Sequence, residues 1–183
     1  RKGMQYVINA LPRIVKKHPE ALYLIIGETH PTVRGIEGEK YRNSLKTMIK
    51  EKGLQRHVKF YNEFLPLNQL CRYIQATDVY ITPYYDPNQI SSGTLAYAVG
   101  AGKACVSTPY LYARDALRDS RGLFVDFKSS RTIADAINRL FDEPGLKQSI
   151  EINALSYGRA WYWENIGNSY LHLFNGITNG SKN

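Results

Sequence analysis

Apolar residues along the 183-residue chain alternate between two kinds of pattern. Short continuous apolar runs, which are typical of buried strands, occur at residues 22–26, 58–61, 79–82, 104–108 and 123–127. Between these runs, apolar residues recur every three or four positions, as on one face of a helix. The helical patterns cover residues 7–15, 45–49, 67–74, 95–101, 133–141 and the section from 154 to 174. Residues 27–39 are expected to form a loop, either solvated or beside a ligand.

Strands that alternate with helices of this length predict right-handed crossovers and a parallel sheet covered on both faces. We therefore expect an α/β fold with a Rossmann-like, doubly wound parallel sheet. The sequence has no internal repeat and no linker-like stretch, so residues 1–183 are predicted to form a single domain. Ligands of such sheets bind outside the carboxyl ends of the strands. These ends are expected near residues 27–30, 61–64, 83–89 and 108–112.

A turn of small polar residues, Ser91-Ser92-Gly93-Thr94, precedes the helical pattern that begins at Leu95. Such a turn at a helix start directs unpaired N–H groups and the positive end of the helix dipole toward one point. This arrangement favours an anion, most often a phosphate. The alternative is an ordinary N-cap, because serine and threonine cap helices in many proteins.

Composition narrows the classes of function. No apolar run is long enough to cross a membrane, and the chain does not open with a signal peptide. The two cysteines and four histidines form neither a CxxC pair nor a ligand motif, so no disulfide framework and no metal site are expected. A reducing, cytoplasmic setting is the simplest interpretation. The net charge of +8 is compatible with an anionic small substrate, an anionic membrane surface, a nucleic acid or a merely solvated surface, but no nucleic-acid-binding motif accompanies it.

The order and spacing of several segments resemble the carboxyl-terminal half of the family-four retaining glycosyltransferases, which have the two-domain GT-B architecture. The similar segments are Arg1-Lys2-Gly3-Met4, residues 22–27, 58–60, 76–83 and 98–107, and Arg121-Gly122-Leu123 with the helix that follows. The resemblance implies that residues 1–183 are a nucleotide-sugar-binding domain, a fragment from which the first strand and the amino-terminal acceptor domain are missing. It implies retaining transfer of a hexose to a saccharide or lipid-linked acceptor in polysaccharide biosynthesis, without a required metal.

The resemblance also implies roles for individual residues. Lys2 takes the place of a lysine that binds the donor diphosphate, and the turn at residues 91–94 takes the place of the phosphate-binding turn. Gln89 and Tyr97 take the places of two glutamates, of which the first contacts the sugar and the second the ribose hydroxyls. Gln89 can still hydrogen-bond to sugar hydroxyls, although it supplies no negative charge. Tyr97 offers one hydroxyl where a carboxylate accepts two hydrogen bonds.

Because both glutamates are replaced, two alternatives remain open. The chain could be a non-catalytic nucleotide-sugar-binding module of a glycan assembly system, or a nucleotide-sugar epimerase of the same fold. Glu28 could replace the partner of the ribose hydroxyls, and Asp86 could supply the carboxylate that Gln89 lacks. Tyr84 and Tyr85 could stack on a sugar or a base, or only cover the sheet end.

Five aromatic residues crowd the tail of the chain: Tyr157, Trp161, Tyr162, Trp163 and Tyr170. They could form a membrane-interface belt, because tryptophan and tyrosine favour that boundary, and a peripheral contact with the inner face of a membrane stays open. The resemblance instead implies that the last helix packs on the amino-terminal domain. Its apolar face is then expected to be exposed in this chain. The sequence does not identify the nucleotide base, the sugar or the acceptor.

Overall fold

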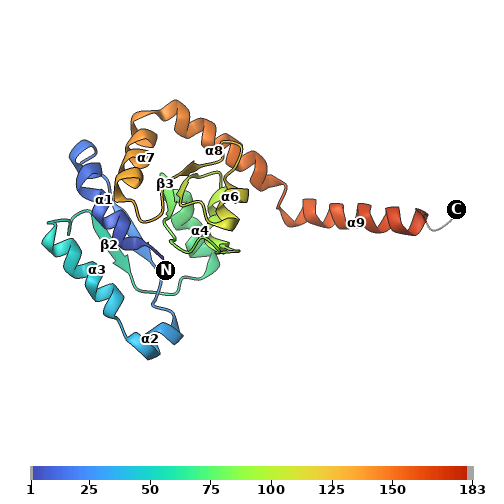
Figure 1. The fold of residues 1–183 in the computed structure, drawn as a ribbon. Coiled ribbons are helices and arrows are strands. Elements are labelled where there is room, and N and C mark those ends of the chain that lie inside the picture. The colour runs from blue at the N-terminus through green and yellow to red at the C-terminus, as the bar shows by residue number, and fades with distance from the viewer. Residues whose placement is uncertain (1, 181–183) are drawn as a thin grey trace.

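The computed structural model describes residues 2–180, in which parallel strands and helices alternate along the chain (Figure 1). The strands are β1 (Tyr23–Ile26), β2 (Val58–Tyr61), β3 (Val79–Thr82), β4 (Ala104–Ser107) and β5 (Leu123–Phe124). The helices are α1 (Met4–Lys17), α2 (Pro31–Glu37), α3 (Lys40–Glu51), α4 (Leu67–Ala76), α5 (Gly93–Gly100), α6 (Leu111–Ala116), α7 (Ser130–Asp142), α8 (Pro144–Arg159) and α9 (Trp163–Gly180).

All of the strand pairings are parallel, but they form two groups instead of the one sheet expected from the sequence. β1 pairs with β2, with Tyr23 opposite Val58 and Ile26 opposite Tyr61. β3, β4 and β5 form a separate three-stranded sheet in that order. No ladder joins β1 to β3 within residues 2–180. The α/β class and the parallel arrangement are thus confirmed, whereas the continuity of the sheet is not.

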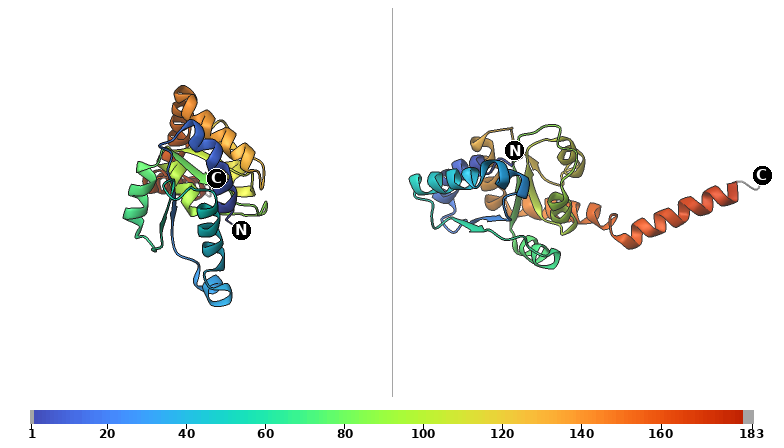
Figure 2. Two further views of the ribbon diagram at one scale, coloured as in Figure 1. Left: turned by 90° about the vertical axis from the view of Figure 1, so that its left-hand side faces the viewer. Right: turned by 90° about the horizontal axis from the view of Figure 1, so that it is seen from below.

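Helices cover both faces of the strands, as a doubly wound fold requires (Figures 1 and 2). On one face, α1, α3 and α7 share a hydrophobic core with Ala104 and Val106 of β4. On the other face, α4, α5 and α6 share a second core with Cys105. Because successive side chains of a strand point to opposite faces, β4 separates the two cores, and all four of its residues are buried.

The structure corrects three expectations about individual elements. Residues 31–37 form α2 rather than a loop, with Pro31 in the first turn and the His30 ring accepting a hydrogen bond from the Thr32 amide. α2 buries none of its residues, so the sequence has no helical period of apolar residues that would have predicted this helix. The short helix α6 was not expected, although its residues Ala113 and Ala116 are buried. The strand expected at residues 123–127 has only two residues.

The tail forms α8, which packs against the body, and α9, which extends away from it (Figure 1). The large apolar side chains of α9 other than Ile166 are exposed, as expected, and 86% of the surface of Trp163 is accessible. No helix within residues 2–180 combines the length and the hydrophobicity that a membrane span needs.

α5 and α8 approach each other closely because a glycine lies at their contact. A Cβ atom at Gly158 would lie 2.7 Å from the Gly100 Cα and 3.0 Å from the Val99 carbonyl oxygen. Both of these atoms belong to the backbone and cannot rotate away. The contact therefore fixes α5, the helix that begins at the polar turn, against a long helix of the body.

We predict that Gly158→Ala lowers the free energy of unfolding by about 1–3 kcal/mol, the usual cost of overpacking. Urea denaturation of the two proteins measures this difference. Gly145→Ala, in the first turn of the same helix, is the matched control, because a Cβ atom there meets nothing within 4 Å. The control should keep or slightly raise stability, since alanine is the better helix former. Equal stability of both variants would contradict the close contact.

Candidate functional site

The polar turn at residues 91–94 leads into α5 at the carboxyl edge of β3 and β4. Ser92 is the N-cap, and its hydroxyl accepts a hydrogen bond of 3.4 Å from the Leu95 amide. The Gly93 and Thr94 amides have no acceptor within residues 2–180. The turn is therefore both a cap and a pair of free donors at the positive end of a helix dipole, a combination that suits an anion.

Open space lies beside Gly93. A Cβ atom placed on Gly93 would meet no atom within 4 Å, and Ser91 is exposed. The Ser92 hydroxyl, in contrast, is directed to the helix that it caps, and the Thr94 side chain lies close enough to Tyr80 to lower the pKa that burial raises there. The groups of the turn that remain available to a ligand are therefore mainly its backbone amides.

Buried hydroxyl groups hold the N-cap in place. The Tyr110 hydroxyl donates to Thr82 Oγ1 at 3.2 Å, and Thr82 Oγ1 donates to Ser107 Oγ at 2.9 Å. The Ser92 side chain lies close enough to Tyr110 to lower the pKa of its hydroxyl. Burial raises the pKa of Tyr110, while Thr82 and Ser92 lower it. The network thus joins the ends of β3 and β4 to the start of α5.

Sequence analysis did not find this network. Its one visible signal is the position of Thr82 and Ser107, which are hydroxyl residues at the ends of apolar strands. Tyr110 follows the second of these strands, and its side chain is completely buried.

Lys2 reaches the same region through stacked tyrosine rings. Its Nζ donates a hydrogen bond of 3.0 Å to the Tyr84 hydroxyl and lies 4.1 Å from the centroid of that ring. The Tyr84 ring stacks on Tyr110, with 5.2 Å between centroids and 21° between planes. Because Tyr110 contacts the N-cap, Lys2 is separated from the start of α5 by this stack. Tyr84 therefore covers the sheet end and orients the lysine.

Gly3 allows the start of the chain to pass close to Pro83, at the end of β3. It has a φ of 75°, and a Cβ atom there would lie 1.9 Å from the Pro83 carbonyl oxygen. Any other residue would both clash and adopt a left-handed conformation, so glycine is required beside the end of β3.

Gln89 supports the turn from inside the loop. Its side-chain amide donates a hydrogen bond of 2.8 Å to the Ser91 carbonyl. Tyr97 lies one turn into α5 and is 44% exposed, which leaves its hydroxyl accessible. Asp86 Oδ1 accepts a hydrogen bond of 3.1 Å from the Asn88 amide, so this carboxylate takes part in the structure of its own loop.

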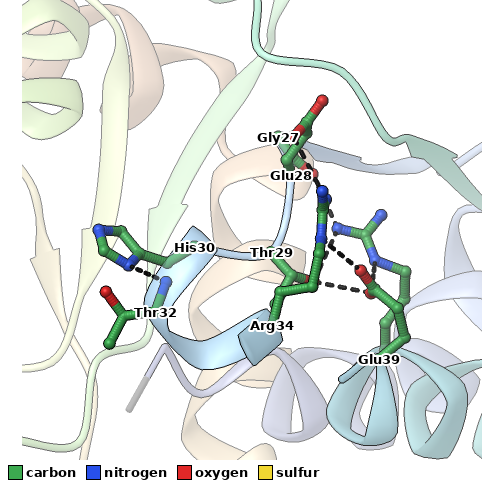
Figure 3. Close-up of polar contacts among 8 residues, drawn as sticks. Gly27, Glu28, Thr29, His30, Thr32, Arg34 and Glu39 are labelled. Carbon is green, nitrogen blue, oxygen red and sulfur yellow. Dashed lines mark hydrogen bonds and ion pairs between the residues drawn. The ribbon is translucent and has the colours of Figure 1, made fainter. Parts of the chain in front are cut away.

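Glu28 lies in a network of ion pairs at the end of β1 (Figure 3). The Arg34 guanidinium is 3.2 Å from a carboxylate oxygen of Glu28 and 3.2 Å from one of Glu39. The hydrogen bond from the Thr29 hydroxyl, followed by the charges of Arg42 and Arg34, lowers the pKa of Glu39. The negative charge of Glu28 is thus compensated within the protein. Sequence analysis missed Arg34 as its partner because residues 31–37 were expected to be a loop.

The candidate site lies on the open surface at the carboxyl ends of β3 and β4. A surface hollow of about 480 Å³ lies elsewhere, at the amino-terminal ends of β1 and β2, and is lined in part by Leu22 and His57. Within residues 2–180, no three histidine, cysteine or acidic side chains are grouped closely enough to hold a metal ion.

Comparisons with known proteins identify the family and the fold. A model of the family described as Glycosyl transferases group 1 matches residues 1–156. A phosphatidyl-myo-inositol mannosyltransferase from Mycobacterium leprae (strain TN) is 25% identical over 184 residues, an alignment that covers 100% of this chain and 45% of that protein. The chain therefore spans a little under half the length of this curated relative.

Solved structures share the fold at lower sequence identity. The C-terminal domain of a glycosyl transferase group 1 family protein (LpcC) from Francisella tularensis has a TM-score of 0.73 at 23% identity, over 85% of this chain and 76% of that one. Anabaena HepE in complex with UDP has a TM-score of 0.79 at 18% identity, over 97% of this chain and 45% of that one. Because the family model matches well over half of its residues, this chain belongs to the Glycosyl transferases group 1 family and has the fold of a carboxyl-terminal GT-B glycosyltransferase domain.

Proposed function

We propose that this chain is the donor-binding domain of a retaining glycosyltransferase and binds a nucleotide-diphosphate sugar. The observation that carries the proposal is the pair of free amides, Gly93 and Thr94, at the start of α5, where the space beside Gly93 is open. A diphosphate needs such donors, and the Lys2 ammonium supplies a full positive charge in the same region. The UDP and UDP-glucose bound to Anabaena HepE, which has the same fold, support this choice of ligand class.

In this proposal the protein stabilises the leaving group of the transfer reaction. Negative charge accumulates on the diphosphate as the glycosidic bond breaks, so the helix start and Lys2 interact more strongly with the transition state than with the bound donor. These protein groups supply the positive charge, and the proposal requires no metal. Gln89 would contact the sugar and Tyr97 the ribose. The hexose would pass to a saccharide or lipid-linked acceptor held by a second domain.

We expect one nucleotide, or its sugar, from a panel of UDP, GDP, ADP and their sugars to raise the melting temperature of the chain. A ligand at a hundred times its dissociation constant adds about 2.7 kcal/mol of stability. Lys2→Ala and Gly93→Val should each reduce this gain, because the first removes the ammonium and the second places a side chain in front of the free amides. Thermal-shift measurements of the variants test the assignment.

The matched controls are Lys16→Ala and Gly35→Val. Lys16 is an exposed lysine at the far end of α1, and Gly35 is a helical glycine with equally open surroundings. Both controls should keep the full ligand-induced shift. Equal shifts in all four variants would mean that the nucleotide binds elsewhere.

We predict that Tyr110→Phe weakens nucleotide binding although Tyr110 does not face the ligand. Loss of the hydroxyl removes the bond with Thr82 beside the N-cap residue Ser92, which should cost about 1 kcal/mol of folding stability and loosen the N-cap. Chemical denaturation and nucleotide titration measure the two effects. Tyr162→Phe, at an exposed tyrosine of the tail, should change neither. Unchanged nucleotide affinity of Tyr110→Phe would show that the network does not support the binding site.

The replacement of two glutamates by Gln89 and Tyr97 favours a second candidate, a nucleotide-sugar-binding module without transferase activity. Incubation of the full-length protein with labelled donors and saccharide acceptors separates the two candidates. Labelled glycoside supports the transferase, whereas donor binding without transfer or hydrolysis supports the module. A change in the sugar of the recovered donor would reveal an epimerase. The 183-residue chain alone is expected to bind donor without transferring it.

A further inference from the structure

The surface hollow at the amino-terminal ends of β1 and β2 lies at the opposite end of the strands from the candidate site. Its volume of about 480 Å³ is within the range of small-molecule sites, about 300–1,000 Å³. It is lined by residues 19–22, which precede β1, and by Arg56, His57 and Lys59 at the start of β2. The hollow thus combines an apolar segment with basic side chains.

Hydrogen bonds hold the two segments around the hollow together. The Tyr23 amide donates to the His57 carbonyl at 2.8 Å, and His57 Nδ1 lies 3.0 Å from the Ala21 carbonyl oxygen. Because a carbonyl oxygen only accepts, Nδ1 carries the hydrogen of this bond and Nε2 takes no part in it. The hollow is therefore formed before a ligand arrives, which reduces the ordering cost of binding.

Positive charge is concentrated in the two segments that meet at the hollow. Residues 16–22 and 50–59 contain six lysines and arginines but only two glutamates. Their net charge of +4 is half of the +8 of the whole chain, although they are only seventeen of its 183 residues. Such a concentration of one sign of charge attracts anions to this end of the molecule.

The lysines at helix ends have a structural explanation, whereas two of the lining cations do not. Lys16 and Lys17 lie in the last turn of α1 and Lys50 in that of α3, where cations offset the negative end of the helix dipole. Arg56 and Lys59 lie beyond the helices, and both are exposed. Neither side chain has an ion-pair or hydrogen-bond partner among residues 2–180, so their charges remain available to a ligand.

We propose that this hollow binds a phosphate ester. The phosphate contacts Arg56 and Lys59, because a guanidinium offers paired N–H donors to phosphate oxygens and an ammonium adds a second positive charge. The carbon part of the ester lies against the apolar side chains of Pro19, Ala21 and Leu22, and Leu22 is 45% exposed.

The lining favours a single phosphate over a long polyanion. Glu20 also lines the hollow and opposes part of the charge of Arg56 and Lys59. A nucleic acid would in addition need a basic surface longer than one small hollow. A soluble ester and a phospholipid headgroup present the same chemical group, and the experiment below separates these two sources. The inference does not rest on nucleotide binding at the carboxyl ends of the strands.

Titration of the isotope-labelled protein with phenyl phosphate tests the site by NMR. The Leu22 and His57 amide signals should shift as the ester binds. The double variant Arg56→Gln with Lys59→Gln should bind phenyl phosphate about fivefold more weakly, because two exposed charge contacts are lost. Both residues are exposed, so the variant should remain folded.

A charge-matched control separates a site from general attraction. Arg72→Gln with Arg159→Gln removes the same charge from exposed positions on α4 and α8, and this variant should keep the wild-type affinity. Leu22→Asn should weaken the binding of phenyl phosphate but not of inorganic phosphate, because only the ester has a carbon part. Lys2→Ala should leave both affinities unchanged, so the inference and the proposed nucleotide site fail independently.

Sedimentation with vesicles of phosphatidylglycerol and phosphatidylcholine identifies the source of the phosphate. Vesicle binding that is lost in the Arg56 and Lys59 double variant and kept in the control assigns the hollow to a lipid headgroup. Binding of phenyl phosphate without vesicle binding assigns it to a soluble ester. Unshifted Leu22 and His57 amides, or an equal loss of affinity in the control, would overturn the inference.

Discussion

The fold and the candidate site depend on the hydroxyl network that joins the ends of β3 and β4 to the start of α5. Buried polar groups are tolerated only when they are hydrogen-bonded, and Thr82, Ser107 and Tyr110 satisfy one another. Ser92, which caps the helix, lies beside Tyr110 of this network. The Gly93 and Thr94 amides next to the cap are consequently held in one direction before any ligand arrives, which reduces the ordering cost of binding.

Close backbone contacts fix the elements around this network. Gly158 lets α8 approach α5, and Gly3 lets the start of the chain pass the end of β3. The second contact brings Lys2 to Tyr84, which stacks on the buried Tyr110. The stack of Tyr84 on Tyr110 therefore lies between Lys2, at the start of the sequence, and the start of α5, about ninety residues later.

The sequence predicted the longer elements whose apolar residues face a core, because burial imposes a period on them, but it missed the six-residue helix α6. It did not predict α2, which buries no residue, or the contact of Thr82 with Ser107, whose partners lie 25 residues apart. The helix start at residues 91–94 was recognised from local chemistry alone. The division of the strands into two groups was not recognised, because the period of apolar residues identifies strands but not which strands pair.

If the chain binds a nucleotide sugar, as we propose, the charges at this edge indicate which part of that ligand the protein stabilises. Arg34 compensates Glu28, and Asp86 accepts a hydrogen bond within its own loop, so neither is an obvious substitute for the absent glutamates. Lys2 and the two free amides lie at this edge, and all of them attract anions. Interactions with the diphosphate strengthen as the leaving group gains charge, whereas a neutral amide such as Gln89 gives little to a positive sugar ring. If the protein transfers sugar, its rate should therefore depend more on stabilisation of the leaving group than on stabilisation of the sugar.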